Sequence, residues 1–188
     1  MNREVFNSIP ILETERLIFR QITLEDLDQV LKIYGDSKVA EYDWYTPVET
    51  EERALKFIND FSDGFKAQEE ITWGIVRKED GVLIGYCCLG DFDDDARRSE
   101  IGYGLMSSQW NKGYGTETVK ALTKFGFETM NLNRIEAFVT PGNHGSIKVL
   151  KKSGFLQEGI VRERDFIKGK LEDGVILAIL KGDYEANL

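Results

Sequence analysis

The segment of the sequence best suited to chemistry covers residues 98–120. A run typical of a strand there meets two closely spaced glycines, Gly113 and Gly115, and then a long amphipathic run. Glycine lets the backbone turn tightly and come close to a ligand. The amides at the start of the following helix would offer N–H donors to a phosphate group, with the positive end of the helix dipole behind them. The segment has neither the Gly-Lys-Ser/Thr ending of a Walker loop nor the third glycine of a dinucleotide fingerprint. We therefore predict a phosphate site of another kind, with a plain tight turn as the alternative.

Charge is distributed unevenly along the chain. The formal net charge is −9, residues 1–100 carry 12 basic and 23 acidic side chains, and residues 110–152 carry seven basic and three acidic ones. A cationic segment within an acidic protein predicts an anionic ligand in the C-terminal half and a cationic ligand facing the N-terminal half. Charges scattered over solvated faces are the alternative. The acidic total argues against nucleic-acid binding, which needs a surplus of basic side chains.

Hydrophobic periodicity predicts the elements that must position these residues. Strands are expected over 12–21, 71–78, 82–89, 98–106, 134–140, 155–167 and 172–180, and helices from Thr23, from Thr46, over 115–130 and over about 142–152. In the second helix, Thr46 is the expected N-cap and Pro47 the first helical residue. The side chains that this helix is expected to bury are Leu55, Ile58, Phe61 and Phe65. The order of elements predicts an α/β (α+β) fold with a mixed sheet.

Length and composition predict one domain over residues 1–188 and limit the class of protein. No apolar run has the length of a membrane span, and the N-terminus lacks the apolar core of a signal peptide. Cys87 and Cys88 are adjacent, which suits neither a disulfide nor a metal site. A cytoplasmic protein without a membrane partner is therefore expected.

Six motifs occur in an order that resembles a known family. They are Thr14-Glu-Arg-Leu-Ile-Phe-Arg20, Glu100-Ile-Gly-Tyr103, Trp110-Asn-Lys-Gly-Tyr-Gly-Thr-Glu117, Asn131-Leu-Asn-Arg-Ile135, Asn143-His-Gly-Ser146 and Lys152-Ser-Gly-Phe155. The chain resembles the GNAT superfamily of N-acetyltransferases and, within it, the RimJ/RimL type that acetylates N-terminal alanine of ribosomal proteins. The resemblance extends from residue 12 to residue 184. It implies a mostly antiparallel mixed sheet of about seven strands flanked by about four helices, with the strands over 98–106 and 134–140 splayed apart.

The resemblance also implies acetyl-coenzyme A as co-substrate and no metal. In the family the pyrophosphate lies on the loop amides, and the pantetheine arm lies beside the preceding strand and the Asn-x-x-Ser segment. The positions that correspond here are Tyr103, Gly104, Leu105, Met106, Asn111, Lys112, Gly113, Tyr114, Gly115, Thr116, Asn143 and Ser146. Two positions depart from the family pattern. Trp110 stands where Arg or Gln is frequent, and Leu150 stands where many members have the tyrosine that protonates the leaving thiolate.

The implied reaction is direct attack of a neutral amine on the thioester. By its place in the strand motif, Glu100 is the expected general base, while a structural ion pair with Arg98 or Arg134 is its alternative role. Asp165, Glu158 or a water relay are the other candidates for the base. Ser146 is expected to hydrogen-bond the thiolate, and a backbone amide near Leu105 or Met106 is expected to bind the oxyanion.

The acceptor expected from the resemblance is the N-terminal α-amine of a protein. The acidic excess of the first hundred residues suits a cationic amine, and Glu41, Asp43, Trp44 and Tyr45 fall in the region where the family places its substrate wall. Acetylation of a small amine (a polyamine, an aminoglycoside or an amino acid) and a non-catalytic sensor that binds acetyl-coenzyme A are the alternatives. The expected state is a monomer or a homodimer.

Overall fold

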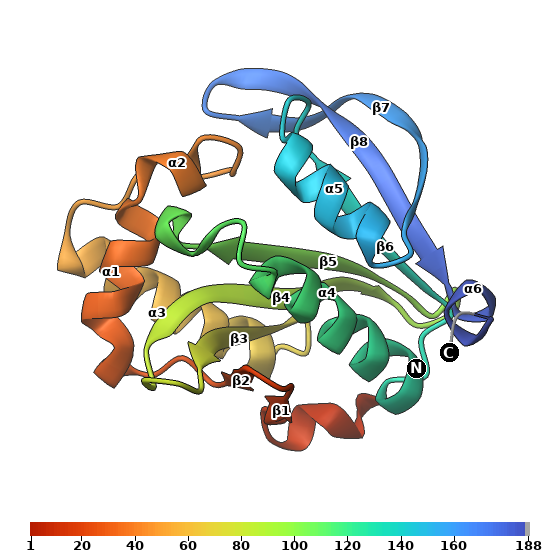
Figure 1. Cartoon of the computed structure of the whole chain (residues 1–188), viewed down its shortest axis with the longest axis horizontal. Coiled ribbons are helices and arrows are strands. Elements are labelled where there is room, and N and C mark those ends of the chain that lie inside the picture. Colours follow the sequence, from red (N-terminus) through yellow and green to blue (C-terminus); the bar gives the residue numbers. More distant parts are fainter. Residues whose placement is uncertain (187–188) are drawn as a thin grey trace.

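The computed structural model describes residues 1–186 and is built on one eight-stranded sheet (Figure 1). In sheet order the strands are β1 (Leu12–Glu13), β2 (Leu17–Arg20), β3 (Glu70–Arg77), β4 (Leu83–Asp93), β5 (Arg98–Leu105), β6 (Arg134–Val139), β8 (Lys170–Leu180) and β7 (Leu156–Ile167). Neighbouring strands are antiparallel except β5 and β6. The predicted mixed, mostly antiparallel sheet is confirmed. It has one strand more than expected because residues 14–16 turn between β1 and β2, which splits the run predicted as one strand over 12–21.

Helices cover both faces of the sheet. The helical segments are η1 (Arg3–Asn7), η2 (Leu24–Asp26), α1 (Leu27–Gly35), α2 (Ser37–Ala40), α3 (Glu51–Lys66), η3 (Ser107–Gln109), α4 (Tyr114–Lys124), the π-helical turn η4 (Phe125–Thr129), α5 (His144–Lys152) and α6 (Lys181–Glu185). In Figure 1, α4 and α5 lie in front of the sheet and α3 lies behind it. Across residues 1–186, no helix is both long and apolar enough to cross a membrane.

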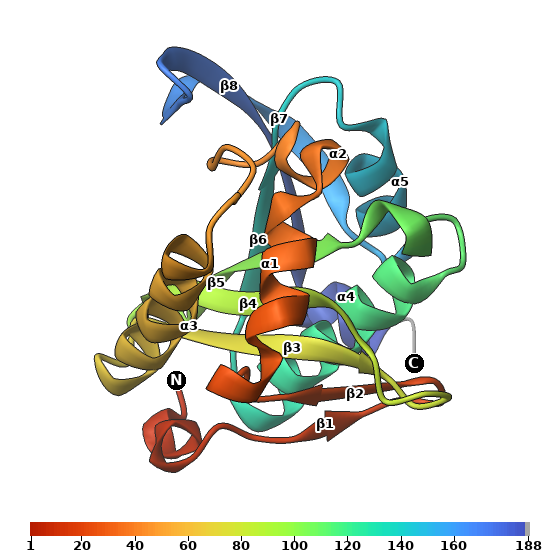
Figure 2. The same ribbon diagram turned by 90° about the vertical axis from the view of Figure 1, so that its left-hand side faces the viewer.

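Two hydrophobic cores follow from this layering. One lies under α4 and α5 and includes Trp73, Val119 and Leu150, while the other lies under α1 and α3 and includes Val30 and Phe57. Successive residues of a strand face opposite sides of the sheet. Strand β3 therefore contributes to both cores (Figure 2).

The start of α3 differs from the prediction. The N-cap is Thr50, whose hydroxyl accepts a hydrogen bond from the amide of Arg53 at 3.3 Å, and not Thr46. Residues 46–49 stay extended or in a loop, where the amide of Val48 donates to the carbonyl of Tyr34. Both threonines can cap a helix, so the contact with α1 decides between them. The buried face of α3 also differs from the prediction at one position. Leu55, which was expected inside, is 36% exposed, and the buried residues are Ala54, Phe57 and Ile58.

Strands β5 and β6 pair over three residues only and then part. The pairs are Arg98 with Arg134, Ser99 with Ile135, and Glu100 with Glu136. Beyond them β6 stays paired with β8, while β5 stays paired with β4. The amide of Met106 donates to the carbonyl of Ile84 in β4. Because backbone groups alternate between the two edges of a strand, those of Tyr103 and Leu105 point into the gap. The predicted splay is confirmed.

A partly buried carboxylate joins the start of α4 to the N-terminal strands. The Glu117 side chain accepts hydrogen bonds from the Thr14 hydroxyl at 2.6 Å and from the amide and Nε of Arg16 at 3.0 and 2.7 Å. The same Arg16 donates to the carbonyl of Lys112 at 2.9 Å. Burial raises the pKa of the Glu117 carboxyl, but these donors outweigh it and hold the pKa below its ordinary value. The Thr14–Arg16 turn therefore fastens the glycine loop to the sheet.

Replacement of Glu117 by Gln is expected to lower the free energy of unfolding by about 1–2 kcal/mol near neutral pH, because the amide cannot replace the charge-assisted bonds. A carboxyl whose pKa is lowered by folding stabilises the protein above its unfolded-state pKa, and this stability is lost as the pH falls through the folded-state pKa. Urea unfolding at neutral and acid pH measures both effects. The difference between Glu117→Gln and wild type should shrink in acid.

Asp60→Asn is the matched control, because it removes an exposed ion pair with Lys56 on α3. Its effect should stay below about 0.5 kcal/mol. An equal loss of stability in the two variants, or a Glu117→Gln effect that does not change with pH, would argue against the ion-paired attachment.

Candidate active site

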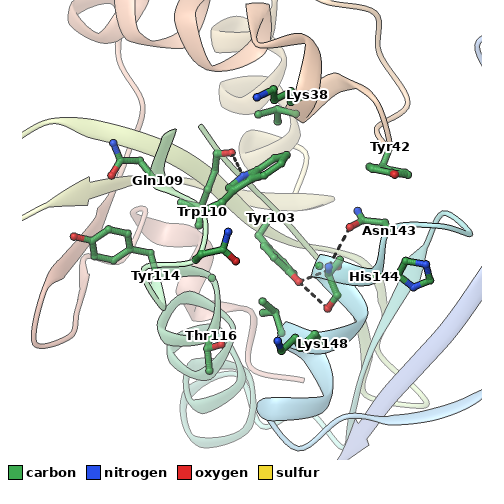
Figure 3. Close-up of a pocket in the computed structure, with 18 of the residues that line it drawn as sticks. Lys38, Tyr42, Tyr103, Gln109, Trp110, Tyr114, Thr116, Asn143, His144 and Lys148 are labelled. Carbon is green, nitrogen blue, oxygen red and sulfur yellow. Dashed lines mark hydrogen bonds between the residues drawn. The ribbon is translucent and has the colours of Figure 1, made fainter. Parts of the chain in front are cut away.

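A cavity of about 570 Å³ lies where β5 and β6 part. It is lined from α2 and the loop after it by Lys38, Val39, Tyr42 and Asp43, and from β5 by Tyr103, Gly104 and Leu105. The glycine loop, α4 and α5 supply its other walls (Figure 3). The cavity thus brings together elements from both faces of the sheet. Five loop residues predicted as phosphate ligands line it, namely Asn111, Gly113, Tyr114, Gly115 and Thr116, whereas Lys112 does not.

The glycine loop delivers the start of α4 to the cavity. Gly113 is the N-cap and has a left-handed backbone with φ of 85° and ψ of −4°. In the part of the chain that the structure describes, no side chain caps this end of α4. The first N–H groups of an α-helix lack partners within the helix, so those of residues 114–116 are free for a ligand that accepts hydrogen bonds. Gly115 lies close to α5, since a Cβ there would come within 3.4 Å of Val149.

Three lysines border the cavity. Lys148 and Lys152 are four residues apart on α5 and share one face of the helix, and Lys38 lies on α2. Figure 3 shows Lys148 beside Thr116, at the end of the cavity formed by α4. Basic side chains and free amides at the same end suit a phosphate-bearing ligand. The positive charge of residues 110–152 indicated such an end, but no motif in the sequence assigns these lysines to the phosphate site.

The middle of the cavity holds a pair of hydroxyl groups. The Tyr103 hydroxyl and Ser146 Oγ are 2.8 Å apart, and the phenol also contacts the Ser146 carbonyl at 3.3 Å. Burial raises the pKa of Tyr103 to about 12, although the Ser146 contact opposes this, so the phenol keeps its proton at neutral pH. Leu150 is fully buried in the core and does not line the cavity. The hydroxyl of Tyr103 was not anticipated from the sequence, which assigned this residue to cofactor binding only.

Asn143 is the N-cap of α5. Its Oδ1 accepts a hydrogen bond from the amide of Ser146 at 3.1 Å, which starts α5 at His144 and aims Ser146 into the cavity. Asn143 and His144 also line the cavity. Capping leaves the Asn143 amide nitrogen available to a ligand.

The three carboxylates predicted as candidate bases lie outside the cavity lining. Glu100 accepts a hydrogen bond from Arg164 at 2.9 Å, and Arg164 also binds Asp165 at 2.7 Å. Arg98 and Arg134, the expected alternative partners of Glu100, bind Glu136 instead, so that part of the prediction is wrong. Burial raises the pKa of Glu100, and Arg164 opposes the shift. Glu158 pairs with Arg134 at 2.6 Å, which lowers its pKa.

Backbone contacts narrow the choice of an oxyanion donor. The Met106 amide already donates to the Ile84 carbonyl in β4, and Met106 does not line the cavity. Of the two predicted oxyanion donors, the Leu105 amide is therefore the one that remains. The Trp110 indole donates to the Leu105 carbonyl at 2.8 Å. The Leu105 amide points into the gap because backbone groups alternate between the two edges of a strand. The Trp110 indole therefore positions β5 and takes no part in the phosphate contact that Arg would make.

The two cysteines lie outside this site. Cys87 and Cys88 are free, neither lines the cavity, and burial raises the pKa of both thiols well above the ordinary value. Among residues 1–186 no three His, Cys, Asp or Glu side chains are grouped so that they could hold a metal ion.

Comparisons with known proteins find one matching family and several similar proteins. The acetyltransferase (GNAT) domain family matches residues 16–156. N-acetyltransferase p20 of Bacillus licheniformis is 38% identical over 173 residues, which is 92% of this chain and 97% of the relative. The crystal structure of a GNAT-family acetyltransferase from Bacillus anthracis superposes with a TM-score of 0.81 at 27% identity, over 92% of this chain and 99% of that one.

Two further relatives differ in the acceptor that their names give. YdaF of Bacillus subtilis, provisionally assigned as a ribosomal N-acetyltransferase, is 34% identical over 106 residues, or 56% of this chain and 58% of YdaF. Spermidine N(1)-acetyltransferase of Escherichia coli is 26% identical over 167 residues, or 89% of this chain and 87% of the relative.

Replacement of Gly113 by Ala is expected to destabilise the loop by about 1–2 kcal/mol, because an L-residue is strained at a left-handed φ. The added Cβ would also lie 3.2 Å from Arg16 Nη2. Urea unfolding measures the loss. Gly159→Ala in β7 is the control, since a Cβ there meets nothing within 4 Å. A Gly113→Ala variant as stable as the control would mean that the loop does not need its left-handed glycine.

Proposed function

The chain belongs to the GNAT family of acetyltransferases, and from that premise we propose that it transfers an acetyl group from acetyl-coenzyme A to the N-terminal α-amine of a protein. The observation that carries the proposal is the cavity at the parting of β5 and β6. One end of it offers free amides and lysines, and its middle offers an unpaired strand edge. A ligand with phosphates at one end and an amide-containing arm at the other matches both features.

In the proposed complex the pyrophosphate accepts hydrogen bonds from the amides of Asn111 and residues 113–116, which line the cavity. Lys148 and Lys152 supply positive charge beside it. The pantetheine arm runs along the free edge of β5, where the backbone groups of Tyr103 pair with its amides as another strand would. The Asn143 side-chain nitrogen is a further donor. The thioester then lies in the gap between the strands.

The reaction proceeds by attack of a neutral amine on the thioester carbonyl. The Leu105 amide steadies the oxyanion, and the hydroxyls of Ser146 and Tyr103 hydrogen-bond the departing thiolate. Tyr103 thereby fills the role left open by Leu150. Glu100 is the base that the sequence motif suggests, and a water relay would have to link it to the amine because its carboxylate does not line the cavity.

Of the candidate acceptors, an α-amine is the one that loses its proton most easily. Its pKa is about 7.7–8.0, so a sizeable fraction is neutral at physiological pH, whereas a lysine side chain at about 10.4 is almost fully charged. The resemblance to the RimJ/RimL type and the relative YdaF support a ribosomal-protein N-terminus. The spermidine acetyltransferase relative keeps a small polyamine as the second candidate.

Release of coenzyme A thiol tests the proposal against both alternatives. The acceptors are peptides that begin with Ala, Ser or Thr, the same peptides with a blocked N-terminus, spermidine, and an aminoglycoside panel. Turnover that requires a free peptide N-terminus is the expected result. Turnover on spermidine alone would remove the N-terminal assignment, and binding of acetyl-coenzyme A without turnover on any amine would favour the sensor.

Replacement of Ser146 by Ala is expected to lower kcat about 10-fold or more, because the leaving thiolate loses a hydrogen-bond donor. The Kd of acetyl-coenzyme A should change less than threefold, a free-energy change below about 0.7 kcal/mol. Steady-state kinetics and calorimetry measure the two quantities. Ser153→Ala is the control, since its hydroxyl caps the other end of α5 by bonding the Val149 carbonyl. An unchanged kcat in Ser146→Ala would dismiss the serine assignment.

A further inference from the structure

We infer that Asp43 is the carboxylate that binds the ammonium group of the acceptor and takes its proton, an assignment that rests on the proposed acetyl transfer. Asp43 lies in the loop after α2 and lines the cavity from the face of the sheet opposite α4 and α5. Of the carboxylates in the part of the chain that the structure describes, it alone lines this cavity. The site would therefore take a primary alkylammonium that approaches the gap from the α2 side.

A tyrosine places the Asp43 carboxylate beside β5. The Tyr86 hydroxyl donates to Asp43 Oδ2 at 2.5 Å, and the Trp44 amide donates to Oδ1 at 2.9 Å. Tyr86 lies opposite Gly104 in the β4–β5 ladder, and its ring covers that glycine. A Cβ on Gly104 would come within 2.6–2.8 Å of the ring and its hydroxyl, so only glycine leaves room for the phenol. One phenol group thus separates Asp43 from the strand segment along which the thioester is proposed to lie.

The loop that carries Asp43 is tied down on two sides. The Thr140 hydroxyl at the end of β6 donates to the Tyr42 carbonyl at 2.9 Å. Lys168, at the tip of the β7–β8 hairpin, donates to the backbone carbonyls of Ala40 and Glu41. These bonds hold the loop across the open end of the gap, so the carboxylate is positioned before any acceptor arrives. Figure 3 shows the neighbouring Tyr42 side chain at this end of the cavity, across from Lys38.

The surroundings of Asp43 suit a base. Burial raises its pKa, while the Tyr86 hydroxyl, the Trp44 amide and Lys168 act in the opposite direction. The other titratable groups nearby are the phenols of Tyr34 on α1 and Tyr45 on its own loop, whose pKa values burial raises, and Lys38 across the cavity. The phenols therefore stay neutral at physiological pH. A carboxylate with a raised pKa accepts a proton more readily than an ordinary surface Asp.

Glu100 is less well placed for the same task. It lies four residues before Gly104 on β5, which is about 13 Å along the strand. Its carboxylate is bonded to Arg164, whose guanidinium also lies over the ring of Phe138. Arg164 and Asp165 thus complete an ion-paired group in which Glu100 has a structural partner. Asp43 has hydrogen-bond donors but no ion pair within 4.0 Å among the described residues, so it can accept a cationic ligand.

The proton balance of the proposed step is simple. The acceptor ammonium loses one proton to Asp43, and the neutral nitrogen attacks the thioester carbonyl carbon. The C–N bond forms as the C–S bond breaks, and the second nitrogen proton ends on the coenzyme sulfur through the Ser146 and Tyr103 hydroxyls. Asp43 then releases its proton to solvent, which leaves an amide, a free thiol and one proton.

Asp43→Asn tests the assignment with the peptide acceptor in the thiol-release assay. The kcat/KM for the amine is expected to fall about 100-fold, the loss usual for a general base. Activity should be partly restored at high pH, where the amine is already neutral. The Kd of acetyl-coenzyme A should change less than twofold, because Asp43 lies on the acceptor side. Glu41→Gln is the matched control, since it removes the same charge from the same loop at a side chain that does not line the cavity.

Tyr86→Phe gives a second readout that does not depend on the first variant folding. It keeps the ring over Gly104 and removes the donor that lowers the pKa of Asp43. The acid limb of the kcat/KM profile should therefore move to higher pH. An unmoved acid limb would overturn the assignment, as would an Asp43→Asn variant within threefold of wild type or a Glu41→Gln variant with an equal loss.

The failure of this assignment differs from the failure of the proposed function. If wild type turns over the amine and Asp43→Asn does too, the acetyltransferase proposal stands and Asp43 is excluded. A wild-type protein that binds acetyl-coenzyme A but acetylates no amine overturns both.

Discussion

The incomplete pairing of β5 with β6 is the constraint on which the rest of the site depends. Strand β6 has two edges, and β8 satisfies one of them along the whole strand. Strand β5 satisfies the other edge for three residues and then follows β4 away from it. The ion pair of Arg98 on β5 with the buried Glu136 on β6 joins the two strands at the closed end, and Arg134 on β6 binds the same carboxylate. The open end exposes backbone groups that a ligand with amides can bind.

The two ends of the cavity are shaped by contacts between distant parts of the chain. At the phosphate end, Glu117 and Arg16 join α4 to the turn before β2, which holds the glycine loop against the sheet. At the acceptor end, Thr140 and Lys168 hold the loop after α2. Both ends are therefore set before a ligand binds. The protein does not have to order long segments at the moment of binding, which would reduce the affinity.

The uneven charge of the sequence corresponds to basic and acidic side chains at different parts of the cavity. Lys148 and Lys152 come from the cationic segment and lie at the end formed by α4 and α5. Asp43 comes from the acidic first half and lies on the other face of the sheet. In the proposed reaction an anionic coenzyme would approach from the side of Lys148 and Lys152, and a cationic acceptor from the side of Asp43.

The sequence by itself determined most of the strands and helices, the tight glycine turn before α4 and the motifs that indicate the family, because these depend on local periodicity and on residue type. The splayed pair of strands followed from the family resemblance. Only the tertiary structure decided which partners meet: Glu100 with Arg164, Tyr103 with Ser146, and Asp43 with Tyr86 beside Gly104. It also decided that Thr50 and not Thr46 caps α3. Such choices depend on contacts between residues far apart in the chain, which the topology of the sheet creates and no local pattern contains.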